Sequence, residues 1–137
     1  MTQLAEFLFP APAERHAAAI WAWWEDRRLA YNAWVGTAGA FTVGVGLLLS
    51  ILPPGGQGAP PLGAIWQPIA FFGLMANAFY TSGAMVEILA LRLFGRGMLP
   101  VGPALYRMGL TFSVGLALLP MVFFLVAWVL GAVGLAV

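Results

Sequence analysis

The chain has 137 residues, of which 62% are hydrophobic and only 8% charged, and its mean hydropathy is +0.92. Soluble globular domains have about 45–50% apolar and about 25% charged residues, so this composition excludes an ordinary soluble domain and indicates one helical membrane domain. A net charge of +1 without a basic run argues against nucleic-acid binding, and the absence of cysteine excludes disulfides and cysteine-ligated metals.

The N-terminal residues, MTQLAEFLFPAPAERH, lack the positive region and the long apolar stretch of a signal peptide. We therefore expect the mature chain to begin near Met1. A short helix is predicted over residues 12–28, because Pro12 suits the first position of a helix and Glu14 suits its first turn.

Three tryptophans precede the first long apolar run, separated from it by the charge cluster of residues 25–28. A bend at this cluster would let the N-terminal helix lie along the membrane interface, where tryptophan and arginine side chains are favourable. The expected interface anchors are Trp21, Trp23, Trp24, Arg27 and Arg28. Docking of this helix on protein, either on the connection between the second and third spans or on a partner, is the alternative, because acidic residues accompany the arginines.

Three runs are long enough to cross a bilayer, which takes about 20 mostly apolar residues. They cover residues 29–52, 68–91 and 106–130. Proline and glycine end the first run, and Pro120 predicts a kink in the third. The expected fold is an all-α membrane protein with three transmembrane helices and a short interfacial helix before them.

The arginines orient this topology. All six basic residues are arginine, and they all fall on one side of a three-span arrangement. The positive-inside rule makes that side cytoplasmic. Together with the bias towards alanine and arginine, this predicts a bacterial cytoplasmic membrane protein with its N-terminus inside and its C-terminus outside.

The second span carries a polar stripe. Asn77, Tyr80, Thr81, Ala84 and Glu87 follow helical spacing and therefore share one face. Unpaired polar groups in hydrocarbon are costly, so this face is expected to point into protein or a wet cavity. It is interpreted as a hydrogen-bonded seam between helices, with a polar path or ligand pocket as the alternative.

Glu87 is the only acidic residue within the predicted spans. We expect an ion pair with Arg107 at a similar depth on the antiparallel third helix, with Arg92, Arg27 or Arg28 as other partners. The alternative is a carboxylate that handles protons or cations. No second acid, histidine or lysine accompanies it in the spans, which makes a proton relay the weaker interpretation.

Small residues recur at four-residue spacing, which lets helix backbones approach closely in lipid. The rows are Asn32, Gly36, Ala40 and Gly44; Ala38, Thr42 and Gly46; and Gly109, Ser113 and Ala117. These rows fit packing within the bundle or association with a further copy or subunit. Three helices offer few inward faces, which favours a homo-oligomer or a place in a larger complex.

No catalytic pattern is present in the sequence. His16 is the sole histidine and is expected at the surface, and no serine has a companion histidine within the spans. Phosphate-binding, dinucleotide-binding and metalloprotease motifs are absent from the sequence. We expect no enzymatic activity, no cofactor and no metal site.

Two patterns together, WWExRRxxYN and NxxYxxGxxxE, resemble a group of small uncharacterised bacterial integral membrane proteins. Here they comprise Trp23, Trp24, Glu25, Arg27, Arg28, Tyr31 and Asn32, followed by Asn77, Tyr80, Gly83 and Glu87. The resemblance covers about the first two-thirds of the chain and implies that these residues act as a set. It implies no activity.

The sequence favours a non-enzymatic accessory or structural subunit that acts through lateral helix packing, with the lipid bilayer and further copies or other membrane subunits as partners. The alternative is a small oligomeric channel or transporter with a path along Asn77, Thr81 and Glu87. A membrane effector that perturbs the bilayer is a third interpretation.

Overall fold

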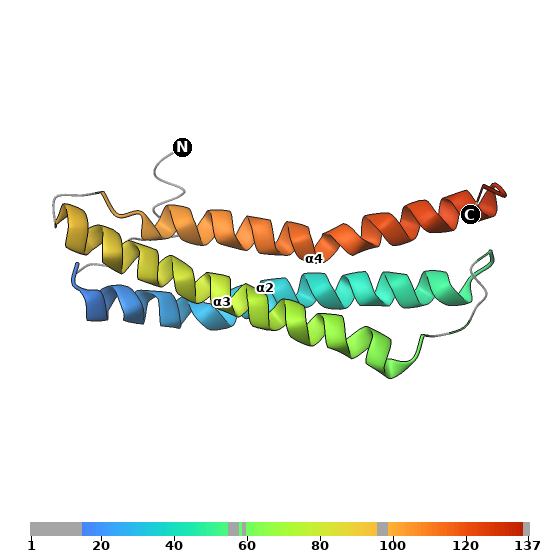
Figure 1. The fold of residues 1–137 in the computed structure, drawn as a ribbon, viewed down its shortest axis with the longest axis horizontal. Helices are drawn as coiled ribbons and strands as arrows, with labels where there is room; N and C mark the ends of the chain where they lie inside the picture. The colour runs from blue at the N-terminus through green and yellow to red at the C-terminus, as the bar shows by residue number, and fades with distance from the viewer. Residues whose placement is uncertain (1–14, 55–57, 59, 96–98, 136–137) are drawn as a thin grey trace.

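A computed structural model shows the protein as a bundle of long antiparallel helices (Figure 1). The structure describes residues 15–54, 58, 60–95 and 99–135. Within these ranges it contains three helices and no strand: α2 (Ala17–Ile51), α3 (Leu62–Phe94) and α4 (Gly102–Ala132). The prediction of an all-α fold with three long apolar helices is confirmed.

Each helix is long and apolar enough to cross a membrane. At about 1.5 Å per residue, the 35, 33 and 31 residues of α2, α3 and α4 give lengths of about 52, 50 and 46 Å. A bilayer core is about 30 Å thick. The helices are therefore longer than the predicted spans, and α3 begins at Leu62, so that Pro68 lies inside it.

The separate interfacial helix predicted over residues 12–28 is not found, and neither is the bend at residues 25–28. Residues 17–28 form the first turns of α2, which continues through the charge cluster without a break, whereas Pro12 and Glu14 lie outside the described residues. Neither proline nor glycine interrupts residues 17–35, and Arg28 pairs with Glu25 one turn earlier at 2.6 Å. The charges are therefore accommodated on the helix surface.

Helix α2 begins at His16. Its Nδ1 accepts a hydrogen bond from the backbone N–H of Ala19 at 3.3 Å, which satisfies one of the free donors at the helix start. The expected surface position of His16 is confirmed, since the side chain is exposed. The sole histidine thus has a local structural role as an N-cap.

The bundle is packed tightly at one end and open at the other. The buried core joins the N-terminal half of α2, the C-terminal half of α3 and the N-terminal half of α4. Towards the opposite end, the N-terminal half of α3 diverges from the other two helices (Figure 1). Helix α4 bends along its length, and Pro120 inside it removes one backbone donor.

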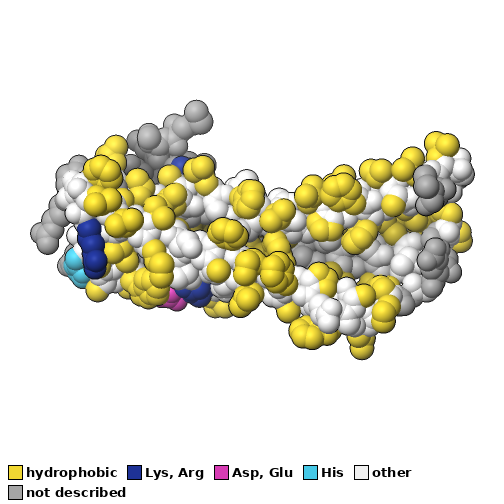
Figure 2. All heavy atoms as spheres, in the orientation of Figure 1, with side chains coloured by type: hydrophobic (Ala, Val, Ile, Leu, Met, Phe, Trp, Pro, Cys, Tyr) yellow, Lys and Arg dark blue, Asp and Glu magenta, His cyan; other side chains and the backbone are white. Residues whose placement is uncertain are grey.

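The outer surface is largely apolar. Hydrophobic side chains cover the visible face along the whole length of the molecule, whereas the charged side chains lie over the tightly packed end (Figure 2). Large residues such as Trp34, Phe79 and Phe123 are at least 63% exposed. A surface of this kind requires lipid or protein around it.

Candidate functional site

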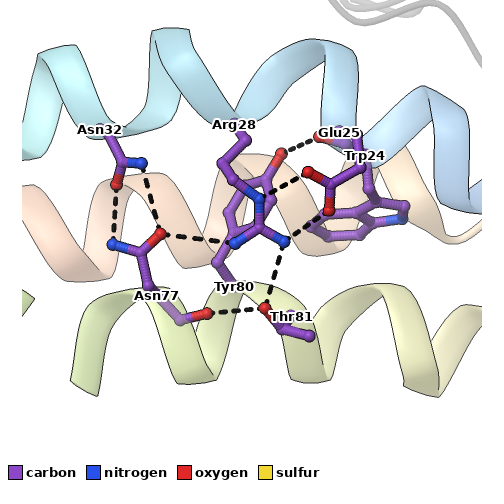
Figure 3. A network of polar contacts seen from close by, with 7 residues as sticks. All are labelled: Trp24, Glu25, Arg28, Asn32, Asn77, Tyr80 and Thr81. Atoms are coloured by element: carbon purple, nitrogen blue, oxygen red, sulfur yellow. Dashed lines mark hydrogen bonds and ion pairs between the residues drawn. The ribbon is translucent and has the colours of Figure 1, made fainter. Parts of the chain in front are cut away.

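The predicted polar stripe of α3 faces a matching polar face of α2. Residues 24, 28, 31 and 32 of α2 lie three or four positions apart and share one face, as do residues 77, 80, 81, 84 and 87 of α3. The two faces meet along the tightly packed half of the bundle (Figure 3). We call these residues the polar seam.

A pair of amides holds one end of the seam. Asn77 Nδ2 donates to Asn32 Oδ1 at 3.0 Å, and Asn32 Nδ2 donates to Asn77 Oδ1 at 3.3 Å. Asn77 Nδ2 also donates to the carbonyl oxygen of Gly73 one turn earlier, at 3.0 Å. The two side chains therefore satisfy each other across the helix interface.

Arg28 lies at the centre of the seam. Its Nη2 and Nε donate to the two carboxylate oxygens of Glu25 at 2.6 and 2.8 Å, so the two charges neutralise each other. The same guanidinium reaches across to α3, donating to Thr81 Oγ1 at 3.2 Å and to Asn77 Oδ1 at 3.4 Å. Its carbon Cζ lies 5.0 Å from the ring centroid of Tyr80. Arg28 thus links both helices.

Glu87 is fully buried, and its partner is an indole. Trp24 Nε1 donates to Glu87 Oε2 at 2.8 Å, and Glu87 Oε1 has no hydrogen-bond partner in the described part of the chain. The expected ion pair with Arg107 is not formed, because Arg107 is exposed on α4. Gly102 and Tyr106, one helical turn apart, are buried instead, and the next residue points about 100° away from them.

The other arginines proposed as partners of Glu87 are also placed differently. Arg27 donates to the carbonyl oxygen of Trp23 at 3.0 Å, and its guanidinium lies 4.0 Å from the centroid of the Trp23 ring. Arg92 is exposed near the end of α3. A buried carboxylate with an indole donor is thus the arrangement that sequence reasoning missed.

Five aromatic residues belong to the buried core that contains this part of the seam: Trp23, Trp24, Tyr31, Tyr80 and Tyr106. The Trp24 and Tyr80 centroids lie 5.1 Å apart in an edge-to-face arrangement, and Trp24 is 6.2 Å from Tyr106. The Tyr80 hydroxyl donates to the carbonyl oxygen of Trp24. We call this set the aromatic cluster.

The tryptophans of the charged stretch therefore divide between core and surface. Trp23 and Trp24 are buried between the three helices, whereas Trp21 is 39% exposed. The expected docking was on the second connection or on a partner, whereas Trp23 and Trp24 pack against Tyr106 of α4 and Tyr80 of α3 in the same chain. Only Trp21 keeps the exposed position of an interface anchor.

Three further hydroxyl hydrogen bonds tie α2 to the other helices, and none of them was expected from the sequence. Tyr31 donates to the carbonyl oxygen of Ala76 on α3 at 3.1 Å, so Ser113 Oγ on α4 donates to the Tyr31 oxygen at 2.7 Å. Thr42 Oγ1 donates to the carbonyl oxygen of Ala117 at 2.7 Å. The sequence signal for these contacts was that Thr42 and Ser113 belong to the rows of small residues.

The small residues lie on different faces of the helices, some facing into the bundle and others outward. Ala38, Thr42, Ser113 and Ala117 are buried inside the bundle, as the packing interpretation expects. By contrast, Gly36, Ala40, Gly44 and Gly109 are exposed. A Cβ atom added at any of the three glycines would meet nothing within 4 Å. These rows thus divide into an inward and an outward set.

The chemistry available in the seam is hydrogen bonding between helices. The described residues contain no group of three or more histidine, cysteine, aspartate or glutamate side chains placed to hold a metal ion. Most polar groups of the seam bond to each other, and these include the buried carboxylate of Glu87, which accepts a bond from Trp24. No protein-family model, curated protein or solved structure matches this chain.

Proposed function

We propose that this protein is a non-enzymatic membrane subunit that acts through lateral helix contacts, assembled with further copies of itself or with other membrane proteins. The proposed location is the cytoplasmic membrane of a bacterium, with the N-terminus inside. All the described arginines lie in the half of the molecule that holds the polar seam, which the positive-inside rule assigns to the cytoplasm.

The observation that carries this proposal is the outward row of Gly36, Ala40 and Gly44 on α2. Rows of this kind let a second helix approach closely. Among the described residues, a Cβ atom built at Gly36 or Gly44 meets nothing within 4 Å. Trp34 and Phe41, seven residues apart and therefore on the same side of the row, are 63% and 58% exposed. The small residues thus lie beside large apolar side chains on the exposed side of α2.

The polar seam also supports this proposal, because its side chains are bonded between the helices or buried. Asn77 and Thr81 bond to α2, and Glu87 is fully buried against Trp24. A path for ions along these residues, the alternative function, would require these contacts to be exchanged for water. The unpaired Oε1 of Glu87 is the one observation in favour of that path.

Cross-linking in native membranes tests the proposal, since the chain has no cysteine that would interfere. A photoactivatable maleimide attached to Ala40→Cys should yield a covalent adduct with a second copy or with another membrane protein. Leu74→Cys, exposed on α3, is the matched control and should give none. Adding Gly36→Ile should abolish the Ala40→Cys adduct by blocking close approach, whereas Gly115→Ile on α4 should leave it intact.

A protein that stays monomeric, with no adduct from Ala40→Cys, contradicts the proposal. Ion flux in proteoliposomes that disappears in Glu87→Gln would establish the alternative function instead.

A further inference from the structure

The open end of the bundle contains a cavity of about 910 Å³. Its walls are the C-terminal half of α2, the N-terminal half of α3 and the C-terminal half of α4, together with described residues of the α2–α3 connection. The volume lies in the range of about 300–1,000 Å³ that is typical of ligand pockets. We call this space the open-end cavity; it lies on the far side of the core from Glu87 and the aromatic cluster.

No charged side chain lines the cavity among the described residues. Thr42, Ser50 and Trp128 are the polar side chains in its described lining, and two of them are already occupied. Thr42 donates to the Ala117 carbonyl, and Ser50 donates to the Leu47 carbonyl at 2.7 Å. The cavity therefore suits an uncharged, apolar molecule.

Trp128 differs from the other two polar residues. Its Nε1 is buried and has no hydrogen-bond partner in the described part of the chain. A buried donor left unpaired costs about 1–3 kcal/mol, so a ligand with an acceptor at this position would relieve that cost. The indole lies four residues before the end of α4 at Ala132, where a membrane-spanning helix approaches the interface.

The cavity matches one leaflet in length. On α4 its lining extends from Leu116 to Gly131, about 22 Å along the axis, and on α2 it extends from Gly39 to Ser50, about 16 Å. One leaflet of a hydrocarbon core is about 15 Å thick. The cavity thus begins near the middle of the helices and ends close to their termini, as an acyl chain does in its own leaflet.

We propose that the open-end cavity binds a lipid through a long apolar chain with a carbonyl group at its head, and that this carbonyl accepts a hydrogen bond from Trp128 Nε1. The chain would lie between α3 and the other two helices, in the leaflet on the side of the α2–α3 connection. A helix from another protein is a bulkier occupant than an acyl chain, because its diameter with side chains is about 10–12 Å. The proposal does not depend on lateral assembly.

Native mass spectrometry of the full chain in detergent, titrated with ester-linked and ether-linked phospholipids of equal chain length, tests the proposal. The two lipids differ in the carbonyl, so the parent protein should retain one ester lipid per chain and prefer it by roughly fivefold, as one hydrogen bond predicts. Trp128→Phe should bind both lipids equally. If a free fatty acid competes as well as the ester phospholipid does, the site recognises the apolar chain and its carbonyl alone, and not the rest of the phospholipid.

Filling the cavity with large side chains provides a second test of the proposal. Ala64 and Ala127 line it, and replacing both with Trp should lower lipid retention at least tenfold. Ala78→Trp is the control, since this exposed α3 residue does not line the cavity. Unchanged retention in the filled variant, equal retention of ester and ether lipids by the parent, or a lipid-free dimer that the filled variant disrupts would each overturn the proposal.

Discussion

Gly102 is the residue that allows a carboxylate to be buried beside the start of α4. A Cβ atom at this position would lie 2.7 Å from the carboxyl carbon of Glu87 and 2.8 Å from its Oε1. Such distances are well inside van der Waals contact, and Glu87 is fully buried and bonded to Trp24, so it has little freedom to move aside. The absence of a side chain at Gly102 is therefore a requirement of the packing.

Gly102→Ala should lower the free energy of unfolding by about 1–3 kcal/mol, the usual cost of forcing an extra methyl group into a packed core. Gly109→Ala on the same helix is the matched control, because a Cβ atom there meets nothing within 4 Å. Unfolding in mixed micelles with increasing fractions of denaturing detergent measures both. Equal effects at the two glycines would show that the contact with Glu87 is unimportant.

At the scale of helices, α2 and α3 are held together by side chains that each bond across the interface. Asn32 with Asn77 and Arg28 with Thr81 form the largest group of such contacts. Individual interhelical hydrogen bonds in membranes contribute about 0.6 kcal/mol on average. Each bond of the seam therefore contributes little to stability alone, but together the bonds stabilise the helix pair and fix the register of the two helices.

Asn77→Leu should reduce the free energy of unfolding by about 1–2 kcal/mol, since it removes the bonds to both Asn32 and Arg28. Ser82→Ala on the same helix should have little effect, because the Ser82 hydroxyl bonds only to the Ala78 carbonyl of its own helix. A double-mutant cycle with Asn32→Leu then measures the coupling between the two amides. Strictly additive losses would contradict a direct contact.

The periodicity of α3 was sufficient to predict that its polar residues share a face and point at another helix. The partner of Glu87 was not predictable in the same way, because an expected charge pair with Arg107 competed with an indole donor that carries no charge. The outcome depended on the close approach of Gly102, which placed Arg107 outward. Helix register results from packing between distant residues, which no local pattern contains.

The interface helix shows a different limit of sequence reasoning. The charge cluster of residues 25–28 was interpreted as a boundary because charges are unfavourable in hydrocarbon, yet Glu25, Arg27 and Arg28 have good helix propensity and α2 continues through them. Trp23 and Trp24 were assigned to the interface by residue type, whereas packing against Tyr80 and Tyr106 buries them. The resemblance to small bacterial membrane proteins stays a prediction.

At the scale of the molecule, helix length exceeds membrane thickness. A helix of about 50 Å tilted by 40°, the upper end of the observed range, still extends about 38 Å along the membrane normal. A core of about 30 Å leaves part of each helix outside the hydrocarbon. The charged, tightly packed end is the part best suited to contact water.

An N-terminus inside and a C-terminus outside predict opposite labelling of the two ends of α3. In intact cells, a membrane-impermeant maleimide should label Pro60→Cys, in the connection before α3, and leave Arg92→Cys unlabelled until the membrane is permeabilised. Both positions are exposed on the protein, so accessibility of the side chain is matched. The reverse pattern would invert the proposed orientation.

The divergence of α3 gives the molecule a mechanical property. Its C-terminal half is held by the aromatic cluster, Ala76 and Phe72 still pack in or against that core, and residues 62–71 extend beyond it, a length of about 15 Å. These residues therefore form an arm attached to the packed part of the helix. A rotation of about 10° at Phe72 displaces Leu62 by about 3 Å over that length, so a small rearrangement in the core is passed on to the opposite face.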